Sequence, residues 1–159
     1  MGSEVGRVLV EHGATVLTNL EGRSNATRER AKHAGISSIT DDAELVRRSD
    51  LLLSILVPGE ALVTAGRVSR AMRATGEGTT YVDCNAIAPR TGKAIADLIS
   101  ATGGTPVDAG IVGPPPTRPG VTRFYASGRE AAQFAGLSKF GLDVRLLGDE
   151  IGAASAFKM

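Results

Sequence analysis

Residues 1–24 read MGSEVGRVLVEHGATVLTNLEGRS, and this stretch decides the fold. Apolar residues recur in it at helical spacing up to Gly13, a residue type that often ends helices, so we expect a helix over residues 2–12. A short apolar run at residues 14–17 is typical of a strand, and a polar Gly-Arg-Ser turn follows. Helix, strand and polar turn in this order form the second half of a βαβ unit of the kind that holds nucleotides.

The same alternation of short apolar strands and Ala-rich helices continues along the chain. Strands joined by helix-length crossovers predict an α/β fold of the doubly wound, Rossmann-like type, with a mostly parallel sheet and helices on both of its faces. Ser24 and Pro89 mark two of the helix starts, as an N-cap and as a first helical residue. Further helices are expected over residues 24–34, 41–48, 60–74, 89–102 and 129–137, and strands over residues 36–39, 51–56, 80–84, 105–111, 123–127 and 144–147.

Composition argues against several classes of function. The chain has 159 residues, enough for one domain with a substantial core, and its net charge of +1 offers no basic surface for nucleic acid. The longest apolar run, residues 51–57, is too short to span a bilayer, so we expect no membrane partner. The lone Cys84 and the lack of a secretory leader are compatible with the cytoplasm. No cluster of His, Cys and acidic residues has the spacing of a metal site.

Polar residues at the start of the chain are candidates for cofactor contacts. A dinucleotide fold holds the pyrophosphate on a Gly-rich turn at the start of a helix, where a Cβ would block close approach, and Gly2 is placed as the last glycine of such a turn. Glu21 lies about 20 residues further on, where an acid accepts from the ribose 2′-hydroxyl of NAD. Arg23 and Ser24 occupy the same turn and suit the 2′-phosphate of NADP, so both cofactors stay open.

Six segments along the chain carry a family resemblance. They are MGSEVGRVLVEHG at 1–13, ILVPGEA at 55–61, YVDCNAIAPRTGKAI at 81–95, VDAGIVGPPP at 107–116, RFYASGREAAQF at 123–134 and LLGDEIGAASAFKM at 146–159. In this order they resemble the β-hydroxyacid dehydrogenase and 6-phosphogluconate dehydrogenase superfamily, and most closely its phosphogluconate-dehydrogenase-like branch. The stretch at 110–115 is also similar, more distantly, to imine reductases.

The resemblance implies a chain that is shorter than the family's full length. Family members begin with a strand and a Gly-x-Gly-x-Met-Gly turn, and Met1 and Gly2 match the last two letters of that turn. They continue with an all-helical domain after the residue that matches Lys158. We therefore expect a Rossmann-like NAD(P)-binding domain over residues 1–151 that lacks its first strand, and the start of an interdomain helix at 152–159. The resemblance implies a homodimer for the full-length form.

The resemblance also assigns roles to residues at strand ends. A loop over the nicotinamide side of the cofactor is matched by Leu56, Val57 and Pro58. Asn85 matches a polar residue that meets the nicotinamide or its ribose, although an Asn in this place also suits a helix cap. The family's substrate-binding loop is matched by Gly110, Ile111, Val112 and Gly113. Val112 stands where many members have a Ser, which points away from a simple 3-hydroxyacid and toward a bulkier substrate.

Lys158 matches the family's catalytic lysine, which is a general acid and base on the substrate hydroxyl or carbonyl. The function that follows is an NAD(P)-dependent oxidoreductase of the hydroxyacid dehydrogenase type acting on a small molecule. We expect residues 1–159 alone to be inactive, with Lys158 exposed on a frayed helix end. The alternative is a non-catalytic Rossmann-like module that binds a nucleotide weakly.

Overall fold

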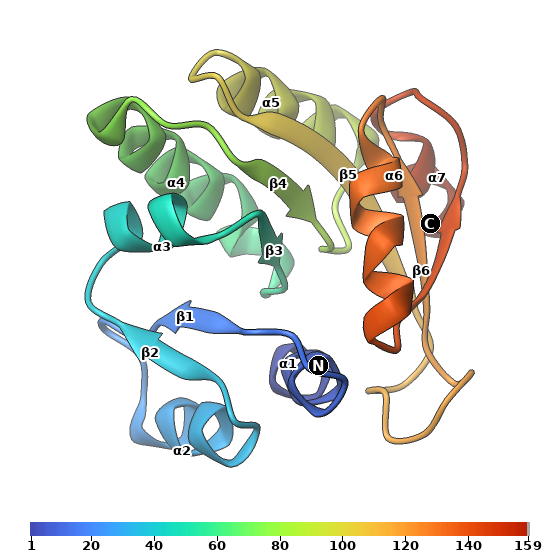
Figure 1. Cartoon of the computed structure of the whole chain (residues 1–159). Helices are drawn as coiled ribbons and strands as arrows, with labels where there is room; N and C mark the ends of the chain where they lie inside the picture. The colour runs from blue at the N-terminus through green and yellow to red at the C-terminus, as the bar shows by residue number, and fades with distance from the viewer. Residues whose placement is uncertain (159) are drawn as a thin grey trace.

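The structure is a computed structural model that describes residues 1–158, with strands in the middle and helices outside (Figure 1). Its helices are α1 (Gly2–Glu11), α2 (Asn25–His33), α3 (Asp42–Arg48), α4 (Ala61–Thr75), α5 (Pro89–Ser100), α6 (Ala131–Ala135) and α7 (Ala153–Lys158), with 3-10 turns η1 (Pro58–Glu60) and η2 (Gly136–Phe140). Its strands are β1 (Leu17–Asn19), β2 (Ser37–Ile39), β3 (Leu51–Ser54), β4 (Thr80–Asp83), β5 (Thr105–Val112), β6 (Arg123–Ser127) and β7 (Asp143–Leu146).

The strands form two sheets. Five of them pair in the order β3-β4-β5-β6-β7, and β1 pairs with β2 in a separate parallel sheet. All pairings are parallel except that of β5 with β6, so the expectation of a mostly parallel sheet is confirmed. The β5–β6 connection is the Pro-rich loop over residues 113–122, which contains no helix to carry a parallel crossover.

The division between the two sheets lies at the centre of a doubly wound order. The doubly wound order is 3-2-1-4-5-6. Here β2 and β1 correspond to its strands 3 and 2, and β3, β4 and β5 correspond to its strands 4, 5 and 6. Among the described residues, no strand occupies the position of strand 1. Among the residues that the structure describes, the edges of β1 and β3 that face this division have no strand partner. Val16, Leu51 and Leu53 near these edges are only partly buried.

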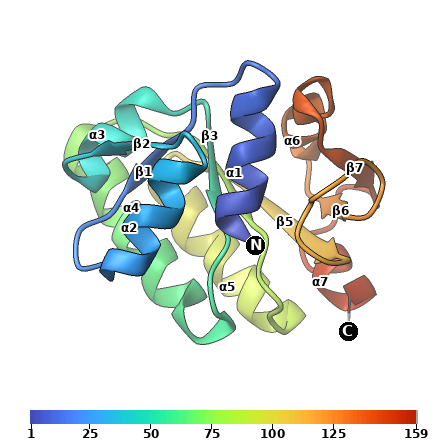
Figure 2. The same ribbon diagram turned by 90° about the horizontal axis from the view of Figure 1, so that it is seen from below.

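Helices cover both faces of the larger sheet, as expected (Figure 2). On one face, α4 and α5 bury a cluster that includes Met72, Tyr81 and Ile99. On the other face, α1 and α6 contribute Val5 and Phe134 to a cluster with strand residues of β4, β5 and β6. Alternate residues of each strand therefore reach opposite cores.

Two predicted boundaries are wrong. A strand was expected over residues 14–17, but β1 begins at Leu17, because the Ala14 amide donates to Leu9 O (2.9 Å) and is used to close α1. A helix was expected over residues 129–137, but α6 is shorter and passes into the 3-10 turn η2, which ends at Gly141 with a φ of +91°. A positive φ suits glycine and stops a helix.

Amide hydrogen exchange should separate the strands by their pairing. Within residues 1–158, β4 is paired on both sides, whereas β1 pairs only with β2. Because exchange requires that hydrogen bonds open, we expect β4 amides to be protected much longer than β1 amides in residue-resolved exchange followed by NMR. Equal protection of the two strands would contradict the divided sheet and show that another strand pairs with β1 in solution.

Candidate functional site

A row of buried polar side chains crosses the larger sheet. Ser54 of β3 is in register with Asp83 of β4, which is in register with Asp108 of β5, which pairs with Ser127 of β6. Residues in register share one face of a sheet, so these four side chains lie side by side on the α5 and α7 face. None is more than 5% exposed. Buried polar groups require hydrogen-bond partners, so this row must be tied to neighbouring elements.

Asn85 supplies these partners at one end of the row. Its side-chain Nδ2 donates to Ser54 Oγ (2.9 Å) and to Asp83 Oδ2 (3.1 Å), and its backbone N donates to Asp83 Oδ1 (2.9 Å). Its Oδ1 accepts from the backbone N of Leu56 (2.6 Å). Asn85 is 3% exposed, and through these hydrogen bonds it joins the carboxyl ends of β3 and β4. Both donor positions of its amide are used inside the protein, so its contact with a cofactor stays a prediction.

Lys158 lies beside the other end of the row. A Cβ built on Gly110 would be 3.3 Å from Lys158 Cβ, 3.4 Å from Lys158 Cδ and 3.3 Å from Ala154 O. The glycine therefore lets α7 lie directly on β5. Lys158 is partly buried in this contact, and the expectation of an exposed lysine on a frayed end is wrong. Its place is toward the carboxyl end of β5, the edge at which open α/β sheets bind their ligands.

The charges of the row influence each other. Burial raises the pKa of the Asp83 carboxyl, and the negative charge of Asp108 adds to this rise. The hydrogen bonds from Asn85 and the positive charge of Lys158 act in the opposite direction. Burial also raises the pKa of the Cys84 thiol, which agrees with the interpretation of this residue as a core filler. The pKa of Asp83 thus responds to a second carboxyl group and to one ammonium group at this edge.

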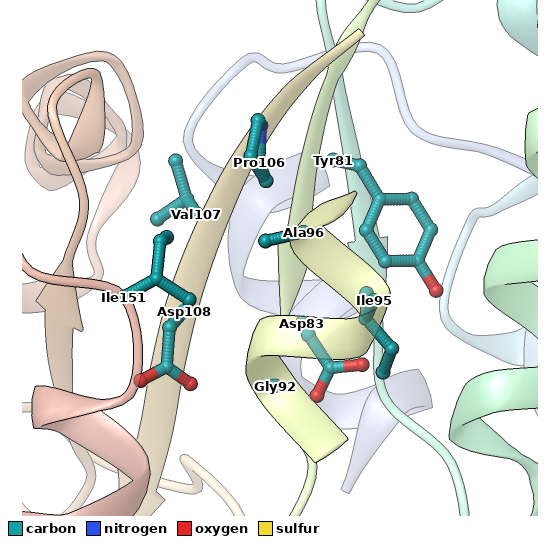
Figure 3. Close-up of a pocket in the computed structure, with 9 residues that line it drawn as sticks. All are labelled: Tyr81, Asp83, Gly92, Ile95, Ala96, Pro106, Val107, Asp108 and Ile151. Atoms are coloured by element: carbon teal, nitrogen blue, oxygen red, sulfur yellow. The ribbon is translucent and has the colours of Figure 1, made fainter. Parts of the chain in front are cut away.

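A cavity of about 10 Å³ lies between α5, β4 and β5, with Asp83 and Asp108 in its wall (Figure 3). A volume of this size holds at most about one water molecule. It is far too small for a nicotinamide ring, so this cavity is not a cofactor site. A larger, polar hollow of about 360 Å³ lies at the opposite, amino end of the strands, near Thr79, Thr80 and Gln133.

The residues predicted to bind a cofactor lie near this carboxyl edge or on the turn after β1. Gly2 begins α1, and a Cβ on it would be 3.7 Å from Ile55, just beyond β3. Leu56 is partly buried, while Val57 is 67% exposed and Pro58 begins η1. Gly2 and this loop are therefore neighbours, although they are far apart in the sequence.

The turn after β1 carries the remaining cofactor candidates. Glu21, Arg23 and Ser24 are all exposed. Ser24 Oγ accepts from the backbone N of Thr27 (3.3 Å) and caps α2, as predicted for a helix start. Arg28 Nε donates to the backbone O of Arg23 (3.3 Å), so two guanidinium groups border the turn.

The predicted substrate loop is divided between two faces. Gly110 and Val112 alternate with Ile111, so they face α7 while Ile111 enters the core on the other face. Val112 is 40% exposed and Gly113 is exposed, at the end of β5. The structure brings Gly110 and Lys158 together and does not bring the Ile111 side chain to them.

Sequence reasoning missed most of the buried row as a functional feature. A polar residue in an otherwise apolar strand is the signal for it, as in the segments LLLSIL, TYVDCN and TPVDAGIV. To recognise that Ser54, Asp83 and Asp108 lie side by side, one must know the register of the strands, and the sequence does not show it. Among residues 1–158, no three His, Cys, Asp or Glu side chains are grouped as metal ligands, and no helix is long and apolar enough to cross a membrane.

The chain matches a known protein family and a curated relative. Residues 1–137 match the family described as the NAD binding domain of 6-phosphogluconate dehydrogenase. A curated relative, the uncharacterized 28.5 kDa protein in the 7S RNA 5′ region of Methanothermus fervidus, is 31% identical over 144 residues. The match covers 91% of this chain and 53% of that protein.

Solved structures show the same fold. A conserved protein of unknown function, whose structure is described as similar to 3-hydroxyacid dehydrogenases, has a TM-score of 0.86 and 36% identity, covering 98% of this chain and 57% of that one. The imine reductase from Myxococcus stipitatus in complex with NADP+ has a TM-score of 0.78 and 21% identity, covering 99% and 55%. At this lower identity the likeness shows the fold alone. The chain spans about half the length of these relatives.

The raised pKa of Asp83 predicts a pH dependence of stability. An acid whose pKa is raised by folding contributes stability below its ordinary pKa of 3.8, and this contribution is lost as the pH rises through the folded-state value. Asp83→Asn cannot ionise, so the free energy of unfolding of the native protein should fall relative to that of the variant over this interval. Urea unfolding across the pH range measures the difference. Asp97→Asn, at an exposed position, is the matched control. If the difference in free energy of unfolding between the native protein and Asp83→Asn depends on pH no more than it does for this control, the prediction is refuted.

Proposed function

Because the chain belongs to the family of the NAD-binding domain of 6-phosphogluconate dehydrogenase, we propose that the whole protein is an NAD(P)-dependent oxidoreductase of the hydroxyacid dehydrogenase type. Its reaction is a hydride transfer between nicotinamide and a hydroxyacid-like or related small molecule. The observation that carries the proposal is the position of Lys158, which packs on Gly110 toward the carboxyl end of β5 within this family's fold. That edge is where ligands of doubly wound folds bind.

The residues at this edge fit a dinucleotide. Helix α1 begins at Met1 and Gly2 with no side-chain cap, so its first amide groups are free of a side-chain acceptor. Free amide groups and the positive end of the helix dipole suit a pyrophosphate. The exposed Val57 offers an apolar surface for the nicotinamide ring, and Leu56 is held beside it by Asn85.

We favour NADP over NAD. Arg23 directly follows Gly22, whose φ of +69° turns the chain, and Arg28 reaches back to the same turn. Guanidinium groups bind phosphate in a bidentate way, which suits a 2′-phosphate. Glu21 would disfavour that phosphate, so the proposal requires this exposed side chain to turn outward.

Lys158 is proposed as the proton donor and acceptor. When bound, the nicotinamide supplies or accepts the hydride. In the direction of reduction the Lys158 ammonium donates a proton to the substrate oxygen or nitrogen, and in oxidation the neutral amine takes it back. Gly110 lets α7 pack directly on β5, because a side chain there would meet Ala154 and Lys158, and this close packing brings Lys158 to the strand end. Val112, exposed at the strand end, is positioned to contact a bulkier substrate.

The remainder of the whole protein is proposed to be a helical domain that follows α7 and forms a homodimer. An exposed apolar side chain on α7 supports this proposal, since Phe157 is 57% exposed and packs against Tyr125 with ring centroids 4.5 Å apart. A cytoplasmic location is also proposed, in keeping with the single, buried cysteine.

The second candidate is a nucleotide-binding module without catalysis. It is supported by the family match, whose description names an NAD binding domain. The two candidates differ in turnover and not in cofactor binding, so binding alone does not separate them.

Cofactor preference is expected to depend on Arg23. Arg23→Ala should weaken NADPH binding about tenfold or more and leave NADH binding nearly unchanged, because only NADPH carries the 2′-phosphate. Fluorescence titration of both cofactors measures this. Glu21→Gln is the matched charge control and should not weaken NADPH binding. Tighter binding of NADH than of NADPH by the native protein would be inconsistent with the proposal.

Turnover is expected to require Lys158. In the whole protein, Lys158→Met should lower kcat by about a hundredfold or more, with little change in the NADPH dissociation constant, because a proton donor is removed. NADPH oxidation with a panel of ketones, hydroxyacids and imines is the assay, and Lys32→Met on α2 is the control. Residues 1–159 alone should bind NADPH without turnover. Turnover by Lys158→Met at the native rate would exclude the assigned role.

A further inference from the structure

Asp108 is a buried acid that the proposed reaction does not use. Its side chain is 3% exposed, and both oxygens are occupied. Oδ2 accepts from the backbone N of Gly152 (3.0 Å), from the backbone N of Ser155 (2.9 Å) and, more weakly, from Ser127 Oγ (3.4 Å). Oδ1 accepts from Ser155 Oγ (2.5 Å). Four donors thus converge on one carboxyl group.

Three of the amide groups at the start of α7 are bound by the sheet. Asp108 takes those of Gly152 and Ser155, and Ser127 Oγ accepts from the backbone N of Ala154 (3.1 Å). Asp108 and Ser127 are paired directly across β5 and β6. Helix N-termini are normally capped by a residue of their own chain segment. Here the cap comes from two strands that precede the helix by more than 25 residues.

The cap determines where Lys158 lies. Helix α7 is tied to the sheet through its first turn, by the hydrogen bonds to Asp108 and Ser127. It is held at its start by Asp108 and rests on Gly110, two residues further along the same face of β5. Lys158 is three residues after Ser155, close to one helical turn beyond the cap. A loss of the cap would therefore move Lys158 relative to the strand ends.

We propose that Asp108, with Ser127, is a positioning residue that holds α7 by its N-terminus and keeps Lys158 at the carboxyl edge of the sheet. This inference rests on the proposed function in that Lys158 is taken as the proton donor. We expect this positioning role to require a carboxylate at residue 108. Asn is nearly as good as Asp at ordinary N-caps, but an amide has a single acceptor oxygen and no charge, so its hydrogen bonds to the backbone amides of Gly152 and Ser155 would be roughly half as strong as those of a carboxylate.

The test compares Asp108→Asn with Ser155→Ala, which removes one donor and keeps the carboxylate, and with the exposed control Asp97→Asn. Amide exchange of residues 152–155 should accelerate about tenfold or more in Asp108→Asn, less in Ser155→Ala, and not in the control. Exchange in β4 should be unchanged, which separates loss of the cap from global unfolding. If Asp108→Asn does not fold, acceleration in Ser155→Ala decides the result.

A second readout reports on Lys158 itself. Modification by trinitrobenzenesulfonate, mapped by mass spectrometry, should become faster at Lys158 in Asp108→Asn and stay constant at the exposed Lys32. These two measurements need no turnover, so they stand even if the proposed function fails. In an active whole protein, kcat should fall about tenfold or more with the KM for NADPH unchanged, because misplacement by about 1 Å can cost a hundredfold. Unchanged exchange at residues 152–155, or unchanged reactivity of Lys158, would overturn the inference.

Discussion

A carboxyl group buried in a protein is costly unless hydrogen-bond donors surround it, and this sheet buries two in register, Asp83 and Asp108. Each of these two carboxyl groups is hydrogen-bonded to a different segment and holds that segment at the carboxyl edge of the sheet. Asp83 is satisfied by Asn85, which also holds Leu56 at the start of the predicted nicotinamide loop. Asp108 is satisfied by the first turn of α7, which carries Lys158. The positions of the loop and of the lysine therefore have the same cause, which is that a buried carboxyl group requires hydrogen-bond donors.

Neutral hydroxyl groups extend this arrangement at both ends. Ser54 accepts from Asn85, and Ser127 accepts from Ala154 while it lies next to Asp108. The row contains no arginine or histidine, and the positive charge at this edge that acts on Asp83 comes from Lys158. Lys158 itself is held at the sheet by packing on Gly110 and by the helix that carries it.

The extent to which the sequence predicts this structure depends on the range of the interactions involved. Helix α1 follows from local apolar periodicity and strand β3 from a short continuous apolar run, and both were predicted to within two residues. The start of β1 was missed because the Ala14 amide closes the preceding helix, a tertiary detail that an apolar run does not reveal. The cap on α7 depends on β6 being antiparallel to β5, which brings Ser127 opposite Asp108. No local pattern shows that pairing, so the resemblance located Lys158 without showing what holds it.

We propose that a nicotinamide dinucleotide binds along the carboxyl edge of the sheet with its nicotinamide beside Lys158. A crystal structure of the protein with NADP is the most direct measurement. We expect the 2′-phosphate at Arg23 and Ser24, the pyrophosphate at the start of α1, and the nicotinamide between Val57 and Lys158. Density for the cofactor at the amino end of the strands, in the hollow near Thr79 and Gln133, would contradict it.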